Sequence, residues 1–386
     1  MKTTQFRDFI ILQRGFDLPK YNRDEGEYPV IAATGIHGSH SEFKVNPPGV
    51  VTGRSGSLGE VVFVKRPYWP LNTTLWVKDF KGNKPRYVYY FLKTLDLKRF
   101  NSGAGVPTLN RNHLDTLVVK IHDRQNQQKV ASILSAYDDL IENNLRRIKI
   151  LEEMVQTLYR EWFVKFRFPG HQKVKMVNSP LGKIPEGWEV AKLCDVVECR
   201  RDTVDSGDHL SDRHYVPIDC LPRKSFTLLE DNPWQEAQSS LQTFECDDIL
   251  FGAMRPYFHK VVIAPLKGVT RSTCFVLRPY RTDDISFALM TVFQEESVKF
   301  ANAHSRGTTI PYAVWDGSMA EMPVILPPPS QRQRFHLMVR PMINFIQSTF
   351  FKQRNLRQTR DLLLPKLISG ELDVSELNIT IPEANA

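Results

Sequence analysis

The stretch from Arg124 to about Phe168 constrains the fold most, because it is long, periodic and free of Gly and Pro. Its apolar positions follow the seven-residue repeat of a coiled coil, with one polar Asn in the series. The predicted seam consists of Val130, Leu134, Tyr137, Ile141, Asn144, Ile148, Leu151, Val155, Leu158 and Trp162. A helix of about 40 residues is roughly 60 Å long, so it needs a second long helix as partner. The alternative is a long helix belonging to one globular core.

A candidate partner helix lies near the other end of the chain, between Pro329 and Gly370. Pro341 is expected to kink this helix or to delay its start, because proline lacks the amide donor and clashes with the preceding turn. The apolar positions at helical spacing are Phe335, Met338, Met342, Phe345, Thr349, Leu356 and Leu363. Two long helices this far apart in sequence imply a folded domain before the first and another between them.

Composition is that of a soluble globular protein, with 41% hydrophobic and 24% charged residues among 386. This length suits two domains of ordinary size. No apolar run reaches the roughly 18 residues of a membrane span, and no signal-peptide pattern opens the chain, so a cytoplasmic location is expected. The formal charge of +8 favours polyanionic partners. The five cysteines form no Cys-x-x-Cys pair, which argues against a zinc module or a disulfide framework.

The expected domain order alternates globular segments with long helices. Short β-rich runs punctuated by turn residues predict a mixed α/β domain on each side of the first helix. The segment after that helix is rich in Pro, Gly and Lys without periodicity, which is typical of a linker. The predicted boundaries are 1–123 for the first domain, 124–168 for the first helix, 169–187 for the linker, 188–328 for the second domain, 329–370 for the second helix and 371–386 for a tail.

The two halves resemble each other in sequence at a fixed offset of 204 positions (307 − 103). The matched residues are Gly103 with Gly307, Val106 with Ile310, Pro107 with Pro311, Ile121 with Ile325, Gln127 with Gln331, and Leu158 with Leu362. Upstream the register slips, and Gly53-Arg54 aligns with Met254-Arg255 only in having a basic residue after a strand. An internal repeat with pseudo-twofold symmetry is the prediction. Two unrelated α/β domains are the alternative.

Several strings in this arrangement resemble the specificity subunit of type I restriction-modification systems. They are LQRGFDLP near the start, GRSGSLGEV in the first domain, SAYDDLIENNLRRIKILEEMVQTLYREWFVKF in the first helix, LGKIPEGWEVAKLCDV at the second domain, and LRQTRDLLLPKLISGELDV near the end. The resemblance implies an α+β fold with two target-recognition domains and an antiparallel coiled coil of two spacer helices. No counterpart of PEGWEVAKL precedes Phe9, so a trimmed edge of the first domain is expected.

The resemblance also implies partners and a division of labour. Each domain would read one half of a split site in double-stranded DNA, with the helices as spacer. Two methyltransferase subunits would use S-adenosylmethionine, and restriction subunits would supply translocation and DNA cleavage. No cofactor or metal is expected in this chain itself.

Catalysis by the chain alone is the competing hypothesis. Asn46-Pro47-Pro48-Gly49 is similar to an adenine methyltransferase loop, but Gly stands where the stacking aromatic is needed, and no glycine-rich nucleotide-binding turn precedes it. Glu42-Phe43-Lys44 has nuclease-like spacing without a paired upstream Asp, and the histidines show no metal-ligand spacing. We therefore predict a non-catalytic targeting subunit. A stand-alone methyltransferase or nuclease, or a coiled-coil protein scaffold, remains the alternative.

DNA readout requires side chains that donate to base edges, and cations that contact phosphates. Loops on a rigid scaffold are the expected location, with a solvated surface role as the alternative for any one residue. The candidates in the first domain are Arg14, Arg54, Ser55, Lys65, Arg66, Tyr68, Asn72, Thr73, Asn110 and Arg111. Those in the second are Arg223, Lys224, Arg255, Tyr257, His259, Lys260, Arg271, Ser272, His304 and Arg306.

Overall fold

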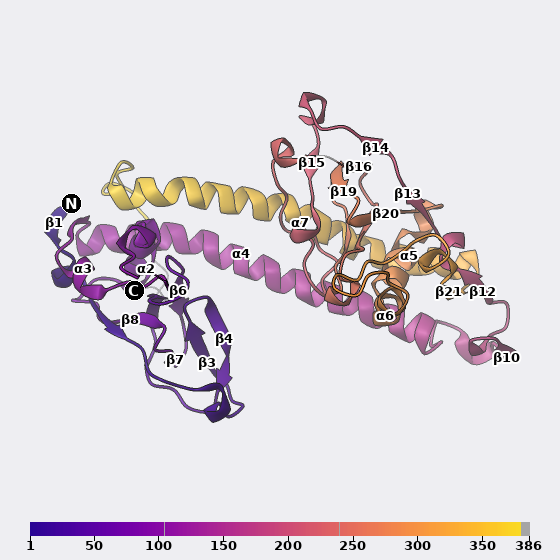
Figure 1. Ribbon diagram of the computed structural model, residues 1–386, viewed down its shortest axis with the longest axis horizontal. Coiled ribbons are helices and arrows are strands. Elements are labelled where there is room, and N and C mark those ends of the chain that lie inside the picture. The colour runs from indigo at the N-terminus through magenta and orange to yellow at the C-terminus, as the bar shows by residue number, and fades with distance from the viewer. Residues whose placement is uncertain (104, 239, 380–386) are drawn as a thin grey trace. The chain divides into compact units, whose positions relative to one another are not determined.

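The computed structural model describes residues 1–103, 105–238 and 240–379, and the chain divides into two compact units (Figure 1). Unit 1 comprises Met1–Leu140 together with the chain from Leu356 onward, and unit 2 comprises Ile141–Asn355. Two long helices contribute to both units, namely α4 (Arg124–Tyr159) and α7 (Pro329–Ser369). The predicted α+β class with two domains is confirmed.

Unit 1 is built on a four-stranded antiparallel sheet of order β2-β8-β5-β6. Its central strand β5 has the sequence GVVTG and is buried along its whole length, so both faces of the sheet are covered there. The strands are β1 Lys2–Gln5, β2 Ile11–Arg14, β3 Tyr28–Ala32, β4 Gly35–His40, β5 Gly49–Gly53, β6 Val61–Val64, β7 Trp69–Pro70, β8 Thr74–Asp79 and β9 Val118–Ile121. The short helices are α1 Phe6–Phe9, α2 Pro85–Thr94 and α3 Arg111–Asp115.

Unit 2 has a four-stranded antiparallel sheet of order β13-β20-β17-β18 and a second sheet of order β14-β16-β19-β15. The strands are β12 Glu189–Lys192, β13 Val197–Arg200, β14 Thr203–Val204, β15 His214–Tyr215, β16 Leu241–Phe244, β17 Ile249–Gly252, β18 Val261–Ile263, β19 Gly268–Arg271, β20 Cys274–Pro279 and β21 Pro323–Leu326. Its helices are α5 Ile285–Phe293 and α6 Glu295–Ala303. In the segment predicted as linker, β10 Met176–Ser179 and β11 Gly182–Pro185 form a hairpin.

The two units repeat one topology. In each main sheet, the strand that leads into a helix pairs on one side with the first strand of the sheet and on the other side with a two-stranded hairpin. The strand orders are β2-β8-β5-β6 and β13-β20-β17-β18. In each, a short first strand pairs antiparallel with the strand that leads into the long helix, as β1 with β9 and β12 with β21. Because β1 occupies the place of β12, the expected trimmed edge of the first domain is wrong.

Helices α4 and α7 run antiparallel within unit 2. Phe335 near the start of α7 contacts Tyr159, the last residue of α4, and Trp162 in the turn that follows, with ring centroids 6.1 and 5.7 Å away. Toward the end of this part of α7, the Gln353 Nε2 donates to the Ile141 carbonyl over 2.9 Å. In unit 1, Leu364 and Leu367 of α7 pack in one core with Val130 and Leu134 of α4.

The predicted seam of α4 faces inward, since its members are buried or half-buried and none is exposed. Of the seven positions predicted for α7, six are buried or half-buried and only Met338 is exposed. A further buried or half-buried series at seven-residue spacing, which the sequence analysis missed, consists of Val339, Ile346, Gln353, Arg360 and Leu367. This repeat is not recognisable as apolar in the sequence, because two of its positions are the polar residues Gln353 and Arg360. The helix begins at Pro329 and continues through Pro341, so that proline does not delay its start.

Glu152 of α4 anchors the segment of residues 225–227 in unit 2. Its Oε1 accepts hydrogen bonds from the Ser225 hydroxyl (2.7 Å), the Phe226 amide (2.9 Å) and the Thr227 hydroxyl (2.6 Å). Burial raises the pKa of this carboxyl above its ordinary value of 4.5, although these donors favour the charged form. In unit 1, Asp138 of α4 has a comparable place, since it accepts from the Tyr90 hydroxyl over 2.6 Å.

Substituting Glu152→Gln is expected to change the pH dependence of stability. A carboxyl whose pKa is raised on folding contributes stability that is fully present below its unfolded pKa, near 4.5, and is lost as pH rises through the folded value. The unfolding free energy of the wild type minus that of Glu152→Gln should therefore fall as pH rises from about 4.5 through the folded pKa. Urea unfolding at several pH values checks this, and a difference independent of pH would contradict it.

Candidate nucleic-acid interface

The same backbone turn follows the third main-sheet strand in both units. In each unit, three main-chain hydrogen bonds of 2.7 to 2.9 Å join the residues after this strand to the turn that precedes β8 or β20 and to a later loop. The unit 1 bonds run from Arg54 to Thr73, from Gly56 to Pro107 and from Leu109 to Arg54, and the unit 2 bonds run from Ala253 to Thr273, from Arg255 to Pro311 and from Ala313 to Ala253. The loop holding Gly103 and Pro107, and its repeat with Gly307 and Pro311, thus have one structural role.

These bonds correct the sequence alignment of the turns. Arg54 is equivalent to Ala253, and Gly56 to Arg255, an offset of 199 positions (255 − 56). The two loops downstream keep the offset of 204, as Leu109 and Ala313 show. The alignment of Gly53-Arg54 with Met254-Arg255 is therefore wrong, because the segments between strand and loop differ in length.

A polar cleft of about 820 Å³ in unit 1 brings four predicted residues together, namely Arg14, Arg54, Asn110 and Arg111. Two of the arginines donate only to carbonyls, Arg54 to Asn72 over 3.3 Å and Arg111 to Leu12 over 3.4 Å. Within the described residues neither has a carboxylate partner, so their charges are not neutralised. The remaining lining residues are Gln13, Gly15, Phe16, Asp17, Leu75, Ser102, Thr108, Leu109 and Asn112.

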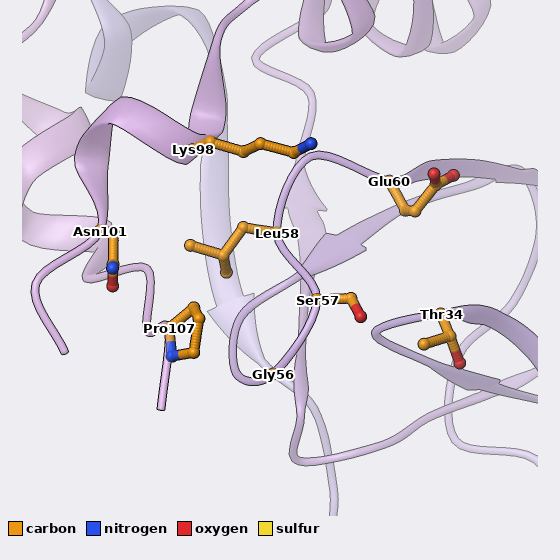
Figure 2. A pocket seen from close by; sticks show the side chains of 8 residues that line it. All are labelled: Thr34, Gly56, Ser57, Leu58, Glu60, Lys98, Asn101 and Pro107. Atoms are coloured by element: carbon orange, nitrogen blue, oxygen red, sulfur yellow. The ribbon is translucent and has the colours of Figure 1, made fainter. Parts of the chain in front are cut away.

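A second hollow of about 590 Å³ lies beside the same turn (Figure 2). Gly56 and Pro107 line it together with Asn101. Lys98 also lines the hollow and extends across the loop of Ser57 and Leu58. The hollow therefore adds one cation beside the polar cleft.

Four predicted arginines of unit 2 lie on segments that main-chain bonds join into one surface. The segments are 223–224, 254–259, 271–273 and 305–312, joined for example by Lys224 to His259, Arg255 to Pro311 and Ala253 to Thr273. In the described part of the chain, Arg223, Arg255, Arg271 and Arg306 have no carboxylate partner. Ion pairs instead hold Arg200, Arg201, Arg213, Arg278, Arg332, Arg340 and Arg354. The unpaired arginines are thus the ones that can accept a new anionic or acceptor partner.

The two units differ at one equivalent pair of positions. In unit 2, Arg201 forms an ion pair with Asp316, with Nη2 and Oδ2 2.5 Å apart. Strand register and the 204-residue offset place Arg14 and Asn112 at the same positions in unit 1. Because Asn112 is neutral, Arg14 remains at the rim of an open cleft and has only a 3.9 Å contact with the exposed Asp17.

Residues 1–153 match the family model described as the type I restriction modification DNA specificity domain. This part of the chain is therefore similar to that family. It is 27% identical over 362 residues to the type I restriction enzyme MjaIX specificity subunit of Methanocaldococcus jannaschii, covering 86% of this chain and 80% of that protein. The MjaVIII specificity subunit of the same organism is 24% identical over 391 residues, covering 92% and 88%.

The fold is shared with a solved structure, the type I restriction-modification S subunit from M. genitalium. The TM-score is 0.64 at 14% identity, and the match covers 95% of this chain and 96% of that one. The family resemblance carried by the helix-end strings is confirmed.

Four of the predicted residues are engaged in contacts within their own unit. Tyr68 is fully buried in the core of unit 1, which raises its pKa. His259 is buried, and its Nε2 lies 2.8 Å from the Phe293 carbonyl; burial lowers its pKa. Lys260 donates to the Ile218 carbonyl over 2.6 Å, and Lys65 pairs with Asp139 at 3.2 Å. Tyr68 and His259 are therefore buried within the two units, and Lys260 and Lys65 have partners inside the protein.

The other predicted residues lie at or near the surface. His304 stacks on Phe300 with ring centroids 4.1 Å apart, and Asn72 donates to the Asp17 carboxylate. The remaining residues are exposed or half-buried, namely Ser55, Arg66, Thr73, Lys224, Tyr257 and Ser272. Sequence reasoning missed Gln13, Ser102 and Asn112 in the cleft, although the repeat offset aligns the last two with Arg306 and Asp316.

Two further properties concern the described residues only. No helix among them combines the length and apolar character that crossing a bilayer requires. Among the same residues, no group of three or more His, Cys, Asp or Glu side chains is arranged to hold a metal ion.

Proposed function

We propose that this chain is the sequence-specific DNA-binding subunit of a type I restriction-modification complex. The observation that carries the proposal is the repeat itself, since two units of one topology each present arginines without carboxylate partners on equivalent turns. Two copies of a reading surface in one chain suit a DNA target with two parts. Unpaired guanidinium groups supply both attraction to phosphates and donors for base edges.

The division between the units follows from their side chains. Unit 1 would bind one half-site through the cleft of Arg14, Arg54 and Arg111. Unit 2 would bind the other half-site through Arg223, Arg255, Arg271 and Arg306. Because the scaffold is shared while the side chains differ, the two half-sites are expected to differ in sequence.

The chain would act as a non-catalytic targeting subunit in the cytoplasm. Methyltransferase subunits, two per chain, would bring S-adenosylmethionine and act on a base in each half-site, and restriction subunits would join them. The names of the relatives, which are specificity subunits of restriction enzymes, support this assignment. The exposed cations Arg146, Arg147 and Lys149 of α4 are available to such partners.

Selection from a randomised DNA duplex library tests the function. The purified chain, alone and with its methyltransferase partner, is expected to enrich one bipartite sequence. Its affinity should fall as salt rises, since phosphate contacts release counterions. Failure to enrich any sequence, even with the partner, would favour a protein scaffold. Transfer of a labelled methyl group to DNA by the chain alone would contradict the non-catalytic assignment.

A further inference from the structure

We propose that Arg223, held over the ring of Phe258, reads a guanine in the half-site bound by unit 2; this rests on the proposed function. The guanidinium carbon lies 3.7 Å from the centroid of the Phe258 ring. Arg223 is exposed, and no ion pair engages it within the described residues. Its planar fork can donate two parallel hydrogen bonds, which match the O6 and N7 acceptors of guanine in the major groove.

The segments that hold this pair have an unusual backbone. Lys224, Arg255 and His259 are left-handed non-glycine residues, with φ of 56°, 52° and 52°. Arg255 and His259 enclose the 3-10 turn Pro256–Phe258, and Lys224 directly follows Arg223. A side chain at positive φ costs energy, and such residues persist where the surrounding structure imposes them, often at binding sites.

The surrounding contacts that impose this geometry are hydrogen bonds. The Lys224 amide donates to the His259 carbonyl over 2.8 Å, which places Arg223 beside the turn. The Arg255 amide donates to Pro311 over 2.7 Å, and the buried His259 ring meets the Phe293 carbonyl of α5 at 2.8 Å. Phe258 is therefore a fixed platform, and the guanidinium above it has lost much of its freedom before any DNA arrives. Preorganisation of this kind favours base-specific hydrogen bonding over non-specific electrostatic attraction to phosphates.

Unit 1 provides the internal comparison. Its turn has Gly56 at the place of Arg255, and Gly59 lies two residues before the next strand, as His259 does. Both glycines are also left-handed, with φ of 92° and 97°. The fold thus requires this backbone at both positions in both units, and glycine meets the requirement without strain. Unit 2 instead keeps two side chains there and builds the platform between them.

A contact from Arg223 to a phosphate is the competing role, and a conservative substitution separates the two. Arg223→Lys keeps the charge and removes the planar fork. A phosphate contact would tolerate this change, whereas bidentate readout of guanine would not. Phe258→Leu removes the ring and keeps an apolar side chain at the half-buried position.

The experiment is selection from a randomised duplex library by the full-length chain and its variants. Wild type is expected to select a guanine at one position of the second half-site. Arg223→Lys and Arg223→Ala should lose that preference. Replacing the guanine in the duplex should lower the DNA affinity of the wild-type protein roughly 10- to 100-fold, and that of the two variants less than about 3-fold. Phe258→Leu should weaken the preference. Arg334→Ala, which removes an exposed arginine of α7 in the same unit, is the control and should leave it intact.

The first half-site reports on folding and on the proposed function. Variants that keep the first half-site preference and the other base preferences of the second half-site have both units folded and bind DNA, so a loss confined to the guanine position supports the proposal. An unchanged second half-site in Arg223→Lys and Arg223→Ala would overturn it, as would a uniform loss of affinity for all sequences. If wild type selects no bipartite sequence, the proposed function fails and this inference fails with it.

Discussion

Substituting Arg332→Ala is expected to lower the unfolding free energy of unit 2 by about 3–5 kcal/mol, because it leaves a buried carboxylate without its cation. Arg332 of α7 forms a bidentate pair with Asp284, with Nε–Oδ1 and Nη2–Oδ2 distances of 2.8 and 3.1 Å. Its Nη1 also donates to the Pro327 carbonyl over 2.8 Å. The side chains of both partners are about one-tenth exposed, so water cannot replace the lost contacts.

Hydrogen exchange of the α5 amides is the appropriate measurement, since Asp284 immediately precedes that helix and the two units need not unfold together. The double variant Arg332→Ala/Asp284→Ala should be less destabilised than the sum of the single variants, because no buried charge remains. Arg146→Ala is the matched control, since it breaks an exposed pair with Glu142 and should cost less than about 1 kcal/mol. A loss of similar size in Arg146→Ala and Arg332→Ala would contradict the argument.

The first long helix was predictable because its signal is local and redundant. Helix α4 begins at Arg124, and nine of the ten seam positions from Val130 to Trp162 are apolar, with Asn144 as the exception. The buried series of α7 that contains Gln353 and Arg360 could not be read in the same way. Gln353 has no accessible surface and Arg360 is half-buried, yet both are polar, and each is stabilised by a partner on α4 that only the fold supplies.

The interface was predictable in part, for a related reason. Loop arginines were identified by residue type and turn context, and Arg14, Arg54 and Arg111 do meet in one cleft. Tyr68 and His259 have the same kind of context, but their side chains point into the core. Whether a turn residue faces inward depends on packing against residues far away in the chain, such as Ile31 for Tyr68 and Phe293 for His259, which local sequence does not encode. The position of Phe258 under Arg223 was missed because it depends on the left-handed backbone of Lys224, Arg255 and His259, which no sequence motif indicates.

Replacing Arg14, Arg54 and Arg111 together by Ala is expected to lower affinity for the selected duplex about 100- to 1,000-fold at roughly 0.1 M salt. Each residue presents a guanidinium to the unit 1 cleft, and removal of three such contacts combines the loss of phosphate attraction with the loss of base readout. Stability should change little, since Arg14 and Arg111 are exposed and Arg54 donates only to a carbonyl. Binding isotherms over a range of salt concentrations measure the effect.

The salt dependence tells which kind of contact was lost. Each phosphate contact removed should reduce the slope of log affinity against log salt by about 0.9. Lost base contacts leave that slope unchanged and relax selection in the first half-site only. The control removes the same number of charges from the exposed face of α4, as Arg146→Ala/Arg147→Ala/Lys149→Ala, and should weaken binding less than about 3-fold, since two of those cations already pair with Glu142 and Glu153. Equal losses in the two triple variants would mean that net charge, and not the cleft, binds the DNA.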